Sequence, residues 1–160
     1  MKPRHPHASS RYQRGASGME FALVFAIFFG IFYAIVSYSL VIFVNQSLTN
    51  VATEAAREAA RLDPINFTST TAFTNAIAAR VRTRVITGIA GLPDKVRTKV
   101  LQSGNIAVTG PDGSGVITVR IVYPNYTDDP LVPSVGSLPF IGSVTYAPSS
   151  LVGVASIRPN

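Results

Sequence analysis

The sequence predicts an α+β fold, in which a long N-terminal helix leads into a domain with a second helix and a small three-stranded antiparallel sheet. Three observations predict it. First, a charge-free apolar run leads into an amphipathic segment that contains no Gly or Pro. Second, a later stretch has apolar residues at every fourth position. Third, β-branched residues alternate with other residues in the last third of the chain. The period changes once, from helical to strand-like, near residue 105.

Residues 21–44 form an apolar run that is long enough to cross a membrane. Sixteen of these residues are Phe, Leu, Ile or Val, and none is charged. As a helix the run measures roughly 36 Å, against about 30 Å for the hydrocarbon core of a bilayer. No small-x-small site follows it, so we expect a retained anchor rather than a cleaved secretory signal.

The residues before this run give its expected orientation. Lys2, Arg4, Arg11 and Arg14 precede it, and no acidic residue lies among them. The positive-inside rule then keeps the N-terminus in the cytoplasm and exports the chain after Val44. We therefore expect a basic leader at 1–15, a long helix at 16–62 with its transmembrane span at 21–44, and an exported α+β head domain at 63–160.

The long helix is expected to continue beyond the apolar run as an amphipathic helix. The segment 45–63 is rich in Ala, Glu and Arg, and Pro64 is the first residue that breaks it. Its apolar face is predicted to consist of Leu48, Val51, Ala55, Ala59 and Leu62. On the exposed side, i,i+3 ion pairs are predicted for Glu54 with Arg57 and for Glu58 with Arg61.

The remaining elements follow in order along the chain. A second helix is predicted for 71–89, because Phe73, Ile77, Val81 and Val85 repeat every four residues, and a short helix is predicted for 95–101. Residues 105–123 alternate around the turn sequence "GPDGSG" and predict a β-hairpin. A Pro- and Gly-rich stretch at 124–142 has no period. A last strand at 151–159 completes the predicted sheet, which the amphipathic helices would cover.

A carboxylate at the edge of the apolar run is the most informative single residue. Glu20 lies directly before Phe21 and five positions after Gly15. If the chain is cut after Gly15, Ala16 becomes the N-terminus, and its amine in a neighbouring subunit can pair with Glu20 next to lipid. The alternative is that Glu20 marks the membrane interface and points outward, which its place near a helix start also favours.

The leader, this junction and the elements behind it resemble a known family. The chain is similar to TadE-like pseudopilins, which have a type IV prepilin-like N-terminus. The similar features are the basic leader, the junction "RGASGMEFALV", the helix "TEAAREAAR" and the late strands "ITVRIVYP" and "VGVASIRP". Gly18 offers a second glycine near the cut, and TadF- and TadG-like proteins share this front end. The resemblance implies a minor structural or assembly component of a tight-adherence (Flp, type IVc) pilus.

The same resemblance implies where the protein acts and what it contacts. It implies a single-pass protein of the bacterial inner membrane with a periplasmic head domain. The implied partners are the membrane, a prepilin peptidase that cuts between Gly15 and Ala16, and other pilus or pseudopilin subunits of the assembly machinery. No enzymatic activity and no cofactor are implied.

Small residues within the span predict a helix-packing face. Ala22, Ala26, Gly30 and Ala34 lie four residues apart, and such a ladder lets a second helix approach closely in lipid. Phe21, Phe25, Phe28 and Phe32 form a neighbouring bulky stripe. Small residues are also common in transmembrane helices without any such role.

Other chemistry is poorly supported by the sequence. The chain has no Cys, and its two histidines, His5 and His7, lie in the leader without a third metal ligand. Arg80, Arg82 and Arg84 lack interleaved aromatic residues, so we expect a solvated helix face rather than a nucleic-acid site; contact with an acidic patch or an anionic headgroup is the alternative. An exported enzyme would need the acids Asp112, Asp128 and Asp129 to converge.

A second hypothesis needs no processing. The chain would then be an uncut single-pass membrane protein whose exported domain binds a carbohydrate or a cell-wall component. The two hypotheses differ in the mass of the membrane-extracted protein, because only the pilus hypothesis requires an N-terminus at Ala16.

Overall fold

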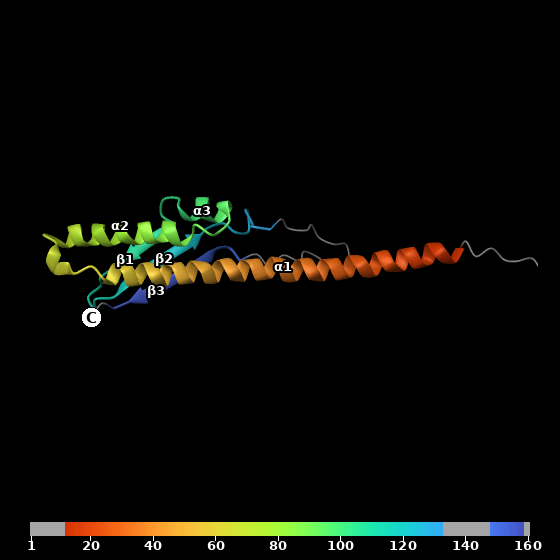
Figure 1. Ribbon diagram of the computed structural model, residues 1–160, viewed down its shortest axis with the longest axis horizontal. Coiled ribbons are helices and arrows are strands. Elements are labelled where there is room, and N and C mark those ends of the chain that lie inside the picture. Colours follow the sequence, from red (N-terminus) through yellow and green to blue (C-terminus); the bar gives the residue numbers. More distant parts are fainter. Residues whose placement is uncertain (1–11, 133–147, 159–160) are drawn as a thin grey trace, which may run out of the picture. The chain divides into compact units, whose positions relative to one another are not determined.

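The computed structural model describes residues 12–132 and 148–158, with side chains from residue 17 onward. The chain divides into two compact units, residues 1–37 and residues 38–160. The expectations for His5 and His7, and for residues 133–142 of the Pro- and Gly-rich stretch, lie outside the described residues. The element order agrees with the predicted α+β class (Figure 1).

The long helix, α1 (Tyr12–Ala60), begins four residues before the predicted start and ends two residues before the predicted end. No Pro occurs between Pro6 and Pro64, so nothing removes a backbone donor from the helix. Its last turn tightens, because the N–H groups of Arg61 and Leu62 donate to carbonyls three residues back. The first unit contains α1 up to Ser37, and the second unit contains it from Tyr38.

In the second unit, α1 supplies one wall of the core. Leu48, Ala52, Ala55 and Ala59 are completely buried, and the apolar face predicted from the sequence is confirmed up to Ala59. Leu62 is only partly buried and packs against the edge of the core. Three of these four residues are alanines, so neighbouring elements can approach the axis of α1 closely.

The second helix, α2 (Thr70–Gly88), runs antiparallel to α1 within the second unit (Figure 1). The hydroxyl of Ser69 caps it by accepting a hydrogen bond from the Ala72 N–H at 3.1 Å. The predicted bounds were each one residue too late. The predicted buried face is confirmed, and it consists of Phe73, Ile77, Val81 and Val85.

A short helix and three strands complete the unit. The helix α3 (Asp94–Val100) buries Val96 and Val100. The strands are β1 (Ile106–Thr109), β2 (Ile117–Tyr123) and β3 (Leu151–Ile157), and they form an antiparallel sheet in the order β1-β2-β3. The register pairs Ile121 with Ile106 on one side and with Gly153 on the other. The predicted hairpin and closing strand are therefore confirmed.

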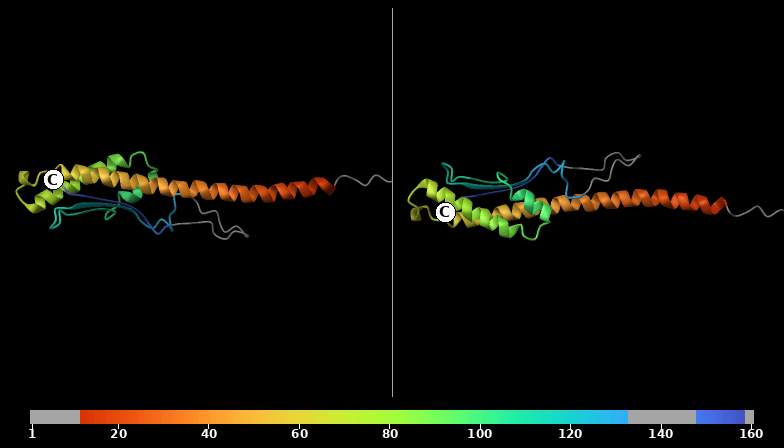
Figure 2. Two further views of the ribbon diagram at one scale, coloured as in Figure 1. Left: turned by 90° about the horizontal axis from the view of Figure 1, so that it is seen from below. Right: turned by 90° about the horizontal axis from the view of Figure 1, so that it is seen from above.

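The helices cover one face of this sheet and leave the other open (Figure 2). On the central strand β2, Ile117, Val119, Ile121 and Tyr123 are completely buried, whereas Arg120 is exposed. This alternation is what a two-layer α+β unit requires, because successive side chains of a strand point to opposite faces.

Strand β3 and α1 come into backbone contact at Gly153. A Cβ at this position would lie 2.4 Å from the carbonyl carbon and oxygen of Leu48 and 2.6 Å from the Thr49 nitrogen. One residue earlier, the Val152 N–H donates to the Asn45 side-chain oxygen at 3.3 Å. A side chain of α1 therefore satisfies a donor on the outer edge of β3, and only glycine permits the approach that brings it there.

Candidate functional site

The predicted processing junction lies inside the first turns of α1. Gly15 is the fourth residue of the helix, and Ala16 and Glu20 follow in the same helix. The side chains of Gly15's neighbours Arg14 and Ala16 are outside the described residues.

Glu20 is exposed at the start of the apolar run. Among the residues whose side chains the structure describes, no cation forms a salt bridge with it. A carboxylate in this position next to lipid has two options, which are to reach water or to pair with a cation from another chain.

As far as Val36, the apolar run presents bulky side chains outward on all sides. Phe21, Leu23 and Phe29, which lie on different sides of the helix, are 51–71% exposed. The helix from Ser17 is long and apolar enough to cross a membrane. A single N-terminal apolar helix of this kind fits a membrane-anchored protein, because so much exposed apolar surface is unfavourable in water.

The four phenylalanines that the sequence predicts as a stripe lie on one face of α1, where their rings stack in two lines. Phe25 stacks with Phe21 and with Phe29, at centroid distances of 6.0 and 6.1 Å, whereas Phe28 stacks with Phe32 at 6.4 Å. Each line follows i,i+4 neighbours, which are the residues that meet on a helix surface.

The predicted small-residue ladder lies along a separate i,i+4 row of α1. Ala22 and Ala26 are exposed, and Gly30 and Ala34 are partly buried. The ladder therefore remains a candidate packing face, and no described contact tests it.

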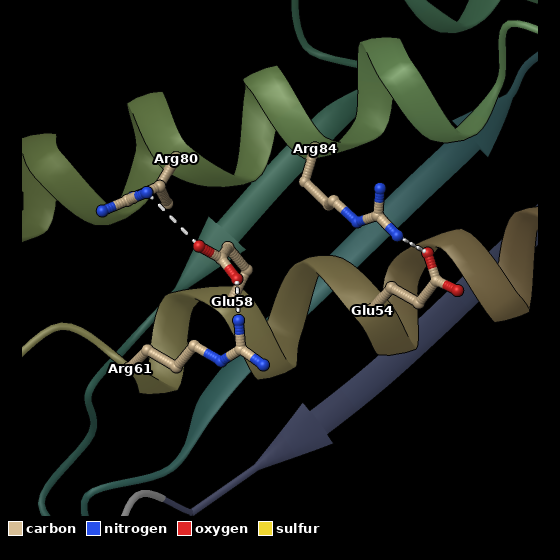
Figure 3. Close-up of polar contacts among 5 residues, drawn as sticks. All are labelled: Glu54, Glu58, Arg61, Arg80 and Arg84. Carbon is tan, nitrogen blue, oxygen red and sulfur yellow. Dashed lines mark hydrogen bonds and ion pairs between the residues drawn. The ribbon is translucent and has the colours of Figure 1, made fainter.

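Five charged residues form an ionic cluster on the surface of the second unit, and four of them link α1 to α2 (Figure 3). Arg84 forms an ion pair with Glu54, and Arg80 forms one with Glu58 at 3.3 Å. Glu58 also accepts a hydrogen bond from Arg61 at 2.9 Å, as predicted. The pairing predicted for Glu54 with Arg57 is wrong, because Glu54 pairs with Arg84 instead.

The Arg80–Arg84 face is exposed to solvent, as predicted, with the Arg80 and Arg84 side chains 54% and 39% exposed. What the prediction missed is that Arg80 and Arg84 also form ion pairs with the acids of α1. The sequence contains a signal for these two ion pairs. Glu54 and Glu58 lie four residues apart, and so do Arg80 and Arg84. In an antiparallel helix pair the first acid meets the last base, which is the observed order.

A second ionic cluster fixes the loop that follows β2. The Lys95 ammonium group lies 2.5 Å from one oxygen of Asp129, and that of Lys99 lies 3.2 Å from the other. Lys95 also donates to the Pro130 carbonyl at 2.6 Å, and the Tyr123 hydroxyl donates to the Asp129 carbonyl at 2.9 Å. The hydrogen bonds from the two lysines hold the pKa of the Asp129 carboxyl below its usual value. Burial raises the pKa of Tyr123 to about 12.

The acidic residues that an enzyme would need do not converge. Asp112 lies in the turn before β2, where its carboxylate accepts hydrogen bonds from the Ser114 hydroxyl and from the N–H groups of Ser114 and Val116. These bonds lower its pKa. Asp128 and Asp129 follow the other end of β2. Within residues 12–132 and 148–158, no three metal-ligating side chains come together.

Comparison with known proteins identifies the N-terminal part of the chain. Residues 15–57 match the model of a family described as TadE-like protein. The matched segment begins at Gly15 and includes Glu20, the apolar run and most of the amphipathic part of α1, so the resemblance inferred from the sequence is confirmed there. TadE-like proteins are a structural family associated with Tad pili. No curated protein and no solved structure matches the chain at a significant level.

Proposed function

We propose that this chain, which carries a TadE-like segment, is a pseudopilin-like component of a tight-adherence (Flp, type IVc) pilus. In this proposal α1 anchors it in the bacterial inner membrane with the N-terminus in the cytoplasm. A prepilin peptidase cuts it after Gly15. The observation that carries the proposal is the family match over residues 15–57, which starts at the predicted cut and contains the exposed carboxylate of Glu20.

Glu20 acts in assembly rather than in the isolated chain. After the cut, Ala16 carries a free amine, and Glu20 becomes the fifth residue of the mature protein. In a bundle of apolar helices an unpaired carboxylate is costly, and the amine of an incoming neighbour removes that cost. The small-residue ladder at Ala22, Ala26, Gly30 and Ala34 lets the two helices approach closely while this pair forms.

The last residues of the apolar run belong to the core of the second unit. Val41 is 9% exposed and Val44 is completely buried in the core of that unit, although both belong to the apolar run. On the opposite side of α1, Phe43 remains 57% exposed. Residues 21–40 alone give a helix of roughly 30 Å, which is enough to span the hydrocarbon core. The exported α+β head then provides lateral contacts to other pilus subunits.

The test is the N-terminus of the protein extracted from the membranes of its native host. Mass spectrometry and N-terminal sequencing are expected to find a chain that begins at Ala16. A Gly15→Ala chain is expected to retain its leader, because the peptidase recognises the glycine. Gly18→Ala is the matched control, since it also exchanges a helical glycine and has no neighbour within 4 Å of an added Cβ.

Two outcomes contradict the proposal. One is a Gly15→Ala chain that still matures to the shorter form. The other is a native chain that begins at Met1 in a strain with functional pili, and this result would favour the uncut protein with an exported binding domain.

A further inference from the structure

The open face of the sheet carries a single charged side chain, Arg120. It lies near the middle of the central strand β2, and it is exposed. Its register partners are Ala107 on β1 and Val154 on β3, so apolar residues flank it on both sides. The three strands contain no acidic residue, and within residues 12–132 and 148–158 no carboxylate forms a salt bridge with Arg120. The guanidinium group therefore has no counter-charge in the described part of the chain.

Valines occupy the part of this face next to Arg120. Val154 is 46% exposed, and the register pairs Val122 with Val152, which are both partly buried. A sheet face that only meets water usually carries polar side chains, because the opposite face already packs on the core. Apolar side chains around one arginine fit the centre of a protein interface instead, where Arg is enriched and Lys, Asp and Glu are depleted.

The polar side chains farther along the face satisfy each other. Thr118 and Ser156 form a register pair, and their hydroxyl oxygens are hydrogen-bonded at 2.9 Å. Arg120 has no such neighbour, and its planar guanidinium group can donate two parallel hydrogen bonds to one carboxylate. The chemistry of this face therefore favours a carboxylate in apolar surroundings.

We propose that the open sheet face binds a protein other than a copy of this chain, and that this partner places an Asp or Glu carboxylate against Arg120. Apolar residues around that carboxylate would pack on the valines and exclude water from the ion pair. The opposite charges would fix the position of the partner on the sheet.

A second copy of this chain is a poor occupant of the face. Docked through the same face, it would supply no carboxylate, because the three strands contain no acid. Two copies would also meet with a net charge of +6 each, which disfavours their association. The proposal does not depend on processing at Gly15 or on the pilus, because the face consists only of strand residues of the second unit.

Photo-crosslinking in the native host tests the proposal. The full-length chain is expressed with the photoreactive amino acid p-benzoylphenylalanine in place of Val154, or in place of Ile86 as the matched control. Both are β-branched residues of the second unit and both are 46% exposed, but Ile86 lies on α2. After irradiation we expect an adduct with a different protein from position 154 and no comparable adduct from position 86.

Charge reversal then tests the role of Arg120, because capture of a protein alone does not. Arg120→Glu is expected to lower the yield of the adduct at least about tenfold, since a central arginine is lost and a repulsion is added. Arg82→Glu is the control with the same change in net charge, because Arg82 is exposed and forms no salt bridge with the described residues. If Arg120→Glu does not accumulate, Arg120→Gln replaces it and is compared with Arg82→Gln.

Mass spectrometry of the adduct identifies the partner and the cross-linked peptide. We expect an Asp or Glu within or beside that peptide, and we expect its exchange for Arg to restore the yield with the Arg120→Glu chain. This rescue separates a direct ion pair from an indirect effect on folding.

Several outcomes would overturn the proposal. One is an adduct whose yield responds equally to the changes at Arg120 and Arg82, and another is the absence of any adduct from position 154. A third is an adduct only with a second copy of this chain or with lipid. N-terminal sequencing of the same membranes reports on the proposed processing separately, so failure of this proposal is distinguishable from failure of the proposed function.

Discussion

Replacing Gly153 by alanine is expected to destabilise the second unit strongly. The new Cβ would lie 2.4 Å from the backbone carbonyl of Leu48, about 1 Å closer than ordinary van der Waals contact allows. Neither partner can move away as a flexible side chain would, because both atoms are backbone. Strand β3 and α1 must therefore separate.

The separation has two further costs. It lengthens the hydrogen bond from the Val152 N–H to Asn45, which is already 3.3 Å, and it loosens the packing of Leu48, which is completely buried. Overpacking a core typically costs about 1–3 kcal/mol, and the rigid partners place this site at the upper end, at about 3 kcal/mol. For a unit of this size, that corresponds to a fall of roughly 10 °C in Tm.

The assay is thermal unfolding of the full-length chain in detergent, followed by the near-ultraviolet circular dichroism of its tyrosines, which include the buried Tyr123 and Tyr126. Gly113→Ala is the control, because an added Cβ meets nothing within 4 Å there, and we expect its Tm to change by about 2 °C or less. A Gly153→Ala chain that melts together with this control would refute the proposed close contact of β3 with α1.

Two further predictions concern the ionic clusters. The ion pair of Glu54 with Arg84 is exposed, so we expect it to contribute little to stability. A double-mutant cycle with Glu54→Gln and Arg84→Gln, measured by urea unfolding, should give a coupling free energy of about 0.5 kcal/mol. A coupling free energy near zero would show that the pair does not link α1 to α2. The carboxyl of Asp129 has a lowered pKa in the folded chain, so its contribution to stability is complete above the unfolded-state pKa of about 3.9 and is lost as the pH falls through the lowered value. The Tm of wild type should therefore exceed that of Asp129→Asn at pH 6 and approach it near pH 2, and a difference that is the same at both pH values would contradict this.

The sequence by itself determined the elements and their buried faces. The apolar run, the four-residue repeat of Phe73, Ile77, Val81 and Val85, and the alternation along β2 each express a local period, and a local period is sufficient to assign a helix or a strand. The spacing of Gly15 and Glu20 is also a pattern of neighbouring residues, and its role as a processing junction stays a prediction.

The tertiary structure decided the contacts between elements that are distant in the chain. Arg84 lies 30 residues after Glu54, and only the antiparallel packing of α2 on α1 makes that pair available in place of Glu54 with Arg57. Gly153 looked like any glycine in a strand until β3 was found against the backbone of Leu48. An apolar pocket likewise combines residues that follow α1 with Phe73 of α2, the β1–β2 turn and Ile117 of β2. Such contacts depend on how faces meet, and the periodicity of a single segment contains no information about its partner.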